Sequence, residues 1–209
     1  MNMVMLKMVK NIVFDMGGVL LDLDVRRTIA EHFPEEYRED IVKNVFYGEQ
    51  WRLMDAGLMR PDEAKEILLP RYPQELRPLL GEMINNFYPY MPPIKETEQL
   101  IARIKKAGYK IYLLSNATPR VFDEYHNIPA LAYMDGMFIS ALYKLLKPGS
   151  EIYNAFCDRF SLKAEECFFI DDMEQNIIGA RACGMKGFVF DTRDFTALEK
   201  ALNDEGVFF

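Results

Sequence analysis

The stretch Asn11-Ile12-Val13-Phe14-Asp15-Met16-Gly17-Gly18-Val19-Leu20-Leu21-Asp22-Leu23-Asp24 decides the fold. Its first part, residues 12–14, is a short β-type run that stops at the carboxylate of Asp15, and a pair of glycines follows. An apolar strand that ends in this way places the carboxylate at its carboxyl end, which is the edge where open α/β sheets bind ligands. A simple turn after a buried strand gives the same pattern, so later stretches must decide whether Asp15 is functional.

Strand and helix patterns alternate from residue 94 onward. Short apolar runs that stop at polar residues are typical of buried strands, and the amphipathic runs between them predict helices. This alternation predicts a doubly wound α/β fold, in which a parallel sheet is joined by right-handed crossovers. The strands expected after 12–14 cover residues 109–114, 137–140, 167–170 and 187–190. The expected helices cover residues 94–107, 151–160, 174–183 and 194–203, with a further helix that opens at Thr118-Pro119.

Residues 25–90 read as helical throughout, with no convincing strand. Nearly seventy residues of helix between one strand and the next are far more than a crossover needs. We therefore expect a small all-helical cap inserted after the first strand, over residues 23–91. The Rossmann-like core would then consist of residues 1–22 and 92–209, with Pro92-Pro93 as a hinge between the two parts.

The composition limits the classes of function. The chain has 209 residues, of which 50% are hydrophobic, and its net charge is −7. This charge argues against nucleic acid or an anionic membrane as the main partner. An acidic protein that handles an anionic substrate needs local help from a metal ion, a lysine or a helix N-terminus. The oligomeric state is left open by the sequence.

The cysteines and the N-terminus bear on the compartment. Three cysteines without a CxxC pair argue against a disulfide framework or a zinc site and favour reduced thiols, which fits a cytoplasmic protein. Residues 1–10 are interrupted by lysines and lack the pattern of a signal peptide, and no run reaches transmembrane length. Only two histidines are present, which argues against a catalytic mechanism with a histidine-activated nucleophile.

Three of the expected strands end in polar residues: Asp15, then Ser115-Asn116, then Asp171-Asp172. The carboxyl ends of parallel strands share one edge, so these groups can converge. Asp15, Asp171 and Asp172 together supply hard oxygen ligands for one Mg²⁺. Without a cation, so many carboxylates would repel one another and take up protons. A helix N-cap is the structural alternative for Asp171-Asp172.

The remaining polar groups suit an anion. Ser115 and Asn116 can donate hydrogen bonds to an oxyanion, and the helix expected at Thr118-Pro119 adds backbone N–H groups. Lys147 lies in a loop before a helix, where it can hold both a nucleophile and a phosphate, although Lys144 is a nearby competitor.

Four motifs in order carry a family resemblance: Phe14-Asp15-x-Gly17-Gly18-Val19, Leu113-Leu114-Ser115-Asn116, Lys147-Pro148, and Phe169-Ile170-Asp171-Asp172-x-x-x-Asn176. They resemble the signature motifs of the haloacid-dehalogenase-like hydrolase superfamily over residues 11 to about 190. The match looks closest to the branch with sugar-1-phosphate phosphatases, small helical caps and the phosphatase domains of some multidomain lipid enzymes.

The resemblance implies a role for each residue. Asp15 would be the nucleophile that forms an aspartyl-phosphate, and Ser115 would bind the transferred phosphoryl group with Asn116 beside it. Lys147 would neutralise phosphate charge and orient Asp15. Asp172 would ligate Mg²⁺, with Asp171 close by, directly or through water.

One position departs from the family pattern. Most phosphatases of this family carry a second aspartate two residues after the nucleophile, and here that residue is Gly17. The backbone carbonyl that the family's metal uses is still present at Gly17, but the side-chain general acid is missing. Asp22 and Asp24 could substitute for it, bind substrate hydroxyls, or form a solvated pair beside the hinge.

Within the cap, the candidates for facing the active site are Trp51, Arg52 and the turn Asp55-Ala56-Gly57. An aromatic ring next to a cation suits a sugar or a phosphate, although the only tryptophan of the chain equally suits a core position.

The leading hypothesis is a Mg²⁺-dependent phosphatase that acts on a small phosphorylated metabolite, such as a sugar phosphate. A metal-independent haloacid dehalogenase also fits the absence of a second aspartate, but Asp171-Asp172 opposes it because two extra carboxylates would hinder attack by Asp15. A weakly catalytic regulatory or binding protein is the third hypothesis, motivated by Gly17.

Overall fold

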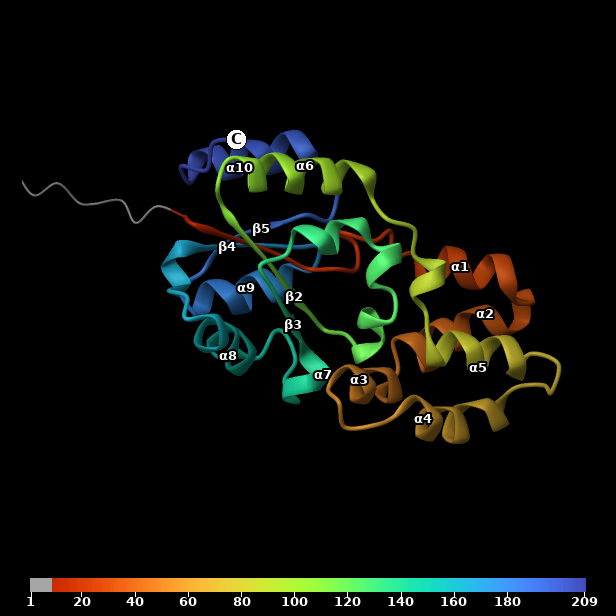
Figure 1. Ribbon diagram of the computed structural model, residues 1–209. Helices are drawn as coiled ribbons and strands as arrows, with labels where there is room; N and C mark the ends of the chain where they lie inside the picture. The colour runs from red at the N-terminus through yellow and green to blue at the C-terminus, as the bar shows by residue number, and fades with distance from the viewer. Residues whose placement is uncertain (1–8) are drawn as a thin grey trace, which may run out of the picture.

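A parallel sheet of five strands forms the centre of the computed structural model, which describes residues 9–209 (Figure 1). The strand order is β3-β2-β1-β4-β5, with β1 in the middle. Every strand lies within one residue of its predicted limits. The strands are β1 (Asn11–Phe14), β2 (Lys110–Ser115), β3 (Gly136–Ile139), β4 (Cys167–Asp171) and β5 (Lys186–Val189).

Helices cover both faces of the sheet, which confirms the doubly wound α/β fold. Side chains alternate across β1, so Ile12 and Phe14 pack on one face and Val13 on the other. The first face is covered by α6 (Lys95–Lys106) and α10 (Phe195–Asp204), and the second by α8 (Ser150–Phe160) and α9 (Glu174–Ala182) (Figure 1). Because both faces are buried, β1 is apolar along almost its whole length.

The segment between β1 and α6 is helical and has its own hydrophobic cluster. It lies to the side of the sheet near the carboxyl ends of the strands (Figure 1). Its elements are α1 (Val25–His32), α2 (Glu35–Ile41), the π-helical turn Val42–Phe46, α3 (Glu49–Asp55), α4 (Pro61–Leu68), the 3₁₀ turn Leu69–Arg71, α5 (Arg77–Asn85) and the 3₁₀ turn Tyr88–Tyr90.

Two chain crossings join the helical segment to the sheet. They lie side by side, because Leu21 and Pro93 form an antiparallel bridge and the amide of Asp22 donates to the carbonyl of Pro92 at 2.8 Å. The paired crossings form a narrow, hydrogen-bonded neck at the position where the sequence predicts a hinge.

The prediction of a helix that begins at Thr118-Pro119 is wrong. Residues 119–133 instead form three short 3₁₀ turns, Pro119–Phe122, Tyr125–Asn127 and Pro129–Tyr133. Pro129 ends any helix that runs into it, because it lacks an amide hydrogen and its ring clashes with the preceding turn. The segment that directly follows Ser115 and Asn116 therefore begins with a 3₁₀ turn and not with an α-helix. The Nδ2 of Asn86 also donates to Oε1 of Glu124 at 2.6 Å, which connects this segment to the helical segment between β1 and α6.

Two features concern the ends of the chain: the segment of residues 1–10 and the packing of residues 207–209. The expectation that residues 1–10 hold no signal segment falls mostly on residues 1–8, which lie outside the described residues. At the other end Val207 is fully buried and Phe209 lies under the guanidinium of Arg103, 5.0 Å from the ring centre, whereas Phe208 is 68% exposed. Two of the last three residues therefore pack onto the rest of the chain. Within residues 9–209, every helix is too short or too polar to cross a lipid bilayer.

Helix α6 contacts the loop that follows β1. The hydroxyl of Thr97, on α6, donates to the carbonyl of Val19 at 2.7 Å, and both residues are buried. We expect Thr97→Val to lower the free energy of unfolding by about 1–3 kcal/mol, because the buried carbonyl loses its donor. Urea-induced unfolding measures this change, with Thr97→Ser as the control that keeps the hydroxyl. Equal stability of Thr97→Val and the wild type would contradict the assignment.

Candidate active site

The polar residues that end neighbouring strands meet at one edge of the sheet. Strand β1 pairs with β2 and β4, and its last residue, Phe14, aligns with Leu113 and Ile170. The next residues of the three strands therefore lie side by side, which brings Asp15 next to Asp171 and near the end of β2, where Ser115 is buried. The loop after α7 (Ser140–Tyr143) then adds Lys147 to the same edge.

Lys147 lies between two carboxylates. Its Nζ is 2.8 Å from Oδ1 of Asp15 and 2.6 Å from Oδ2 of Asp171, and its side chain is only 1% exposed. Burial lowers the pKa of Lys147, but the two carboxylates outweigh burial, so its pKa is raised and the ammonium stays charged. Burial also raises the pKa of Asp15, with Lys147 acting in the opposite direction. The competitor Lys144 is exposed, so Lys147 is the cation of the site.

Asp171 is fully buried, and its carboxylate accepts four hydrogen bonds from three donors. Besides Lys147, it accepts from the amide of Met173 at 2.8 Å and from Nδ2 of Asn176, which is 2.9 Å from Oδ1 and 3.1 Å from Oδ2. These bonds compensate for the burial of the carboxylate. The sequence motif includes Asn176, but we could assign it no role without the contact. Asp171 thus acts as the support of Lys147.

Asn116 has a different contact from the one its sequence position indicates. Its Oδ1 accepts from the amide of Lys147 at 2.9 Å, and its Nδ2 donates to the carbonyl of Lys147 at 3.1 Å. Both ends of the side-chain amide are therefore used to fix the loop that carries Lys147. Ser115, the last residue of β2, is the better candidate for a side-chain contact to an oxyanion.

The carboxylates fit a divalent cation. One oxygen each of Asp15, Asp171 and Asp172 lie within 4.8 Å of one another. Oδ1 of Asp15 is buried and, apart from its ion pair with Lys147, has no hydrogen-bond partner within residues 9–209. Burial and the nearby Asp15 and Asp171 raise the pKa of Asp172 to about 7. One lysine does not balance three carboxylates, so a hard cation would relieve the repulsion.

The two glycines after β1 differ in what they allow. Gly18 has φ +74°, and a Cβ there would lie 2.5 Å from Oδ2 of Asp172, so only glycine lets this loop approach the carboxylate. Gly17 has an ordinary φ, and a Cβ there would meet only the flexible end of Leu23, at 2.8 Å from Cδ2. A side chain at position 17 is therefore sterically possible once Leu23 moves.

Asp22 and Asp24 have structural partners. Asp22 forms ion pairs with Arg193 and with Arg27, and these hydrogen bonds lower its pKa. Asp24 is the N-cap of α1, where its Oδ1 accepts from the amide of Arg27 at 2.9 Å. Neither carboxylate is thus placed to act as the missing acid.

The cap candidates separate into two groups. Trp51 packs against the hydrophobic cluster of the helical segment between β1 and α6, with its ring centre 4.9 Å from that of Phe46, which agrees with a core position. The turn from Asp55 to Gly57 instead docks on the core: the hydroxyl of buried Ser140 donates to the carbonyl of Asp55 at 2.5 Å. No sequence motif pointed to Ser140, because a lone serine after a strand has many structural uses.

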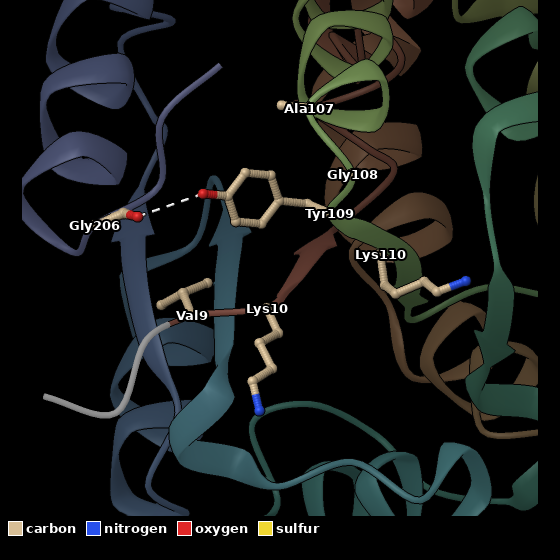
Figure 2. A pocket seen from close by; sticks show the side chains of 7 residues that line it. All are labelled: Val9, Lys10, Ala107, Gly108, Tyr109, Lys110 and Gly206. Carbon is tan, nitrogen blue, oxygen red and sulfur yellow. Dashed lines mark hydrogen bonds between the residues drawn. The ribbon is translucent and has the colours of Figure 1, made fainter. Parts of the chain in front are cut away.

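The pocket shown in Figure 2 lies at the opposite edge of the sheet, where β1 and β2 begin. In this pocket the hydroxyl of Tyr109 donates to the carbonyl of Gly206 at 3.4 Å. The residues that line it are Val9, Lys10, Ala107, Gly108, Tyr109, Lys110 and Gly206. They include no carboxylate and no nucleophile of the candidate site, so this pocket is separate from the chemistry described above.

The chain belongs to the haloacid dehalogenase-like hydrolases, whose family profile matches residues 9–184. The sesquiterpene phosphatase astK of Aspergillus oryzae is 25% identical over 191 residues, covering 85% of this chain and 88% of that protein. The D-ribitol-5-phosphate phosphatase of Bacteroides thetaiotaomicron is 23% identical over 203 residues, covering 87% and 91%. Among solved structures, a HAD family enzyme from the same Bacteroides species, in complex with magnesium and inorganic phosphate, has a TM-score of 0.68 at 22% identity and covers 91% and 98%.

Lys147→Met tests the ion pairs of the site. Removing the ammonium leaves Asp15 and Asp171 buried without a counter-charge, so we expect the free energy of unfolding to fall by about 3–5 kcal/mol. Urea-induced unfolding in the presence of a chelator measures the loss without a metal ion that could replace the lysine. Lys144→Met is the matched control and should change stability little. A similar small effect of both variants would contradict the central role of Lys147.

Proposed function

We propose that the protein is a Mg²⁺-dependent phosphatase that hydrolyses a small phosphorylated metabolite through an aspartyl-phosphate intermediate. The observation that carries the proposal is the pairing of Lys147 with both Asp15 and Asp171. Asp172 lies next to them, and among residues 9–209 its side chain has no ion-pair partner. A nucleophile, a fixed cation and a further carboxylate for a metal are the parts that phosphoryl transfer requires. The phosphatase names of the two relatives support the same reaction class.

Each residue has a part in this reaction. An oxygen of Asp15 attacks phosphorus, and Lys147 holds this carboxylate in place and balances the charge of the phosphoryl oxygens. The hydroxyl of Ser115 donates to one of these oxygens. Asn116 acts on the reaction by fixing the backbone of Lys147, and Asp171 acts by holding the ammonium group of Lys147. Water then attacks the phosphorus of the aspartyl-phosphate and restores Asp15.

The metal would be held by Asp15, by the backbone carbonyl of Gly17 and by Asp172, with Asp171 nearby. We assign Asp172 as the direct ligand because the oxygens of Asp171 are already occupied by Lys147, Met173 and Asn176. When bound, Mg²⁺ would neutralise the charge that gathers on the phosphoryl oxygens.

We further propose that residues 23–91 form a cap over a catalytic core made of residues 1–22 and 92–209, and that the cap selects the substrate. The relatives' names point to phosphate esters of different alcohols, a sesquiterpene and a sugar alcohol. A sugar phosphate is one member of this class, and the cap rather than the catalytic edge must choose among them. A cytoplasmic location is supported by three cysteines that are all free thiols.

The dehalogenase hypothesis also has an observation in its favour, which is the absence of a carboxylate at position 17. Against it, Asp172 adds negative charge beside Asp15, and burial together with its neighbours raises the pKa of Asp172. A carbon–halogen bond attacked by Asp15 gains nothing from such a carboxylate, whereas a metal-bound phosphate does.

The release of nitrophenol from 4-nitrophenyl phosphate tests the proposal. We expect turnover that depends on Mg²⁺, stops with a chelator and falls by at least about 10³-fold in Asp15→Asn, because the amide is a poor nucleophile. Asp62→Asn, on the exposed side of the cap, is the control. Turnover that ignores the chelator, or that survives Asp15→Asn, would refute the mechanism.

Failure of this test separates the other hypotheses. Chloride release from a 2-chloro acid in the presence of chelator would establish the dehalogenase. Binding of one equivalent of phosphate without turnover of any ester would point to the regulatory protein.

A further inference from the structure

The reaction proposed above needs a proton at one step, and no residue assigned so far supplies it. When the bond between phosphorus and an alcohol oxygen breaks, that oxygen takes the electron pair and must be protonated unless it is a good leaving group. The glycine at position 17 has no side chain for this task, and Asp22 and Asp24 are held by other partners. The donor must therefore come from another element that faces Asp15.

The turn at the end of α3 brings one carboxyl group of the cap to the active site. The carbonyl of Asp55 accepts the hydrogen bond of Ser140, and the hydroxyl of Ser140 in turn accepts from the amide of Ala117 at 2.8 Å. Ala117 lies two residues after Ser115. The same three groups thus connect the cap turn to the strand end that carries the candidate phosphate contact.

Gly57 makes the docking of this turn possible. Its φ is +65°, and a Cβ at this position would lie 2.0 Å from the carbonyl oxygen of Ala141. The turn therefore lies in direct backbone contact with α7, and α3 and α7 lie next to each other in Figure 1. The position of Asp55 is fixed by the core as well as by the cap.

The side chain of Asp55 has no structural partner. Within the described part of the chain it makes no ion pair and no hydrogen bond, although the residue is half-buried. Burial raises its pKa well above the usual range, the charge of Asp15 raises it further, and Lys147 acts in the opposite direction. The Asp55 carboxylate therefore interacts electrostatically with both Asp15 and Lys147. Burial also raises the pKa of the Tyr88 phenol, and the charges of Asp55 and Asp15 raise it further.

We propose that Asp55 is the general acid of this phosphatase and replaces the carboxylate that is missing at Gly17. This inference rests on the proposed function. Two observations carry it. The turn that bears the unpartnered Asp55 carboxyl group is docked on the active-site edge through Ser140 and Gly57. Position 17 has no carboxylate, and Asp22 and Asp24 on the same loop are held by other partners.

The two half-reactions balance with this group. In the first, an oxygen of Asp15 forms a bond to phosphorus, the ester bond breaks, and the leaving oxygen takes the proton of the neutral Asp55 carboxyl group. In the second, the Asp55 carboxylate removes a proton from water as the water oxygen bonds to phosphorus. The bond between phosphorus and Asp15 breaks, its electron pair returns to Asp15, and inorganic phosphate leaves with Asp55 neutral again.

A pair of esters with different leaving groups tests the role. Nitrophenolate leaves without a proton, whereas phenolate is more basic and benefits from one. We expect Asp55→Asn to lower kcat/KM for phenyl phosphate by about 10²-fold or more, and to lower kcat/KM for 4-nitrophenyl phosphate by no more than about threefold. Asp62→Asn, another cap aspartate, should change neither value.

Three results would overturn the inference, each in a different way. Equal losses of kcat/KM on both esters in Asp55→Asn would mean that Asp55 only maintains the shape of the site. Equal activity of wild type and variant on both esters would mean that Asp55 takes no part. Absence of phosphate release from either ester by the wild type would instead refute the proposed function itself.

The double variant Gly17→Asp/Asp55→Asn provides a second test. A side chain at position 17 needs only a movement of Leu23, so an aspartate can be accommodated there. We expect the double variant to hydrolyse phenyl phosphate at least about tenfold faster than Asp55→Asn, because it regains an acid. A double variant that is no faster on phenyl phosphate, but as active as Asp55→Asn on the nitrophenyl ester, would contradict proton donation as the lost function.

Discussion

The ammonium group of Lys147, held between Asp15 and Asp171, is the interaction on which the rest of the site depends. A buried ion pair stabilises a protein only when its remaining donors and acceptors are satisfied. Here Asp171 accepts hydrogen bonds from Met173 and Asn176, and Asn116 fixes the backbone of Lys147. These bonds explain why polar residues end three neighbouring strands. Lys147 in turn is the ion-pair partner of Asp15.

The sequence predicted the fold well because its strands are buried on both faces and therefore nearly all apolar, as residues 167–171 illustrate. It also predicted which residues gather at the sheet edge, since parallel strands share that edge. It could not assign the partners of each side chain, so the amide contact of Asn116 and the support given by Asn176 became visible only in the structure. The helix expected at Thr118 failed because Pro129 and the contact of Glu124 with the cap outweigh local helix preference.

The helical segment that we propose as a cap contacts the rest of the chain at several places, and two of these contacts have different consequences. The neck around Leu21 and Pro93 keeps the two chain crossings together, whereas the contact of Ser140 with the carbonyl of Asp55 closes the cap turn onto the sheet edge. The second contact is a single hydrogen bond and a glycine fitted against a backbone oxygen, so it can be broken at modest cost. An enzyme whose acid lies on such a turn would assemble its full set of catalytic groups only when the cap is docked.

The central claim is that Asp15 carries the phosphoryl group during turnover. The most direct measurement is peptide mass spectrometry after the protein, 4-nitrophenyl phosphate and Mg²⁺ are mixed and quenched in acid within a single turnover. The account predicts a phosphorylated peptide that contains Asp15, absent when a chelator is present and absent in Asp15→Asn. Turnover with an unmodified Asp15 peptide, or a phosphoryl group on another residue, would contradict it.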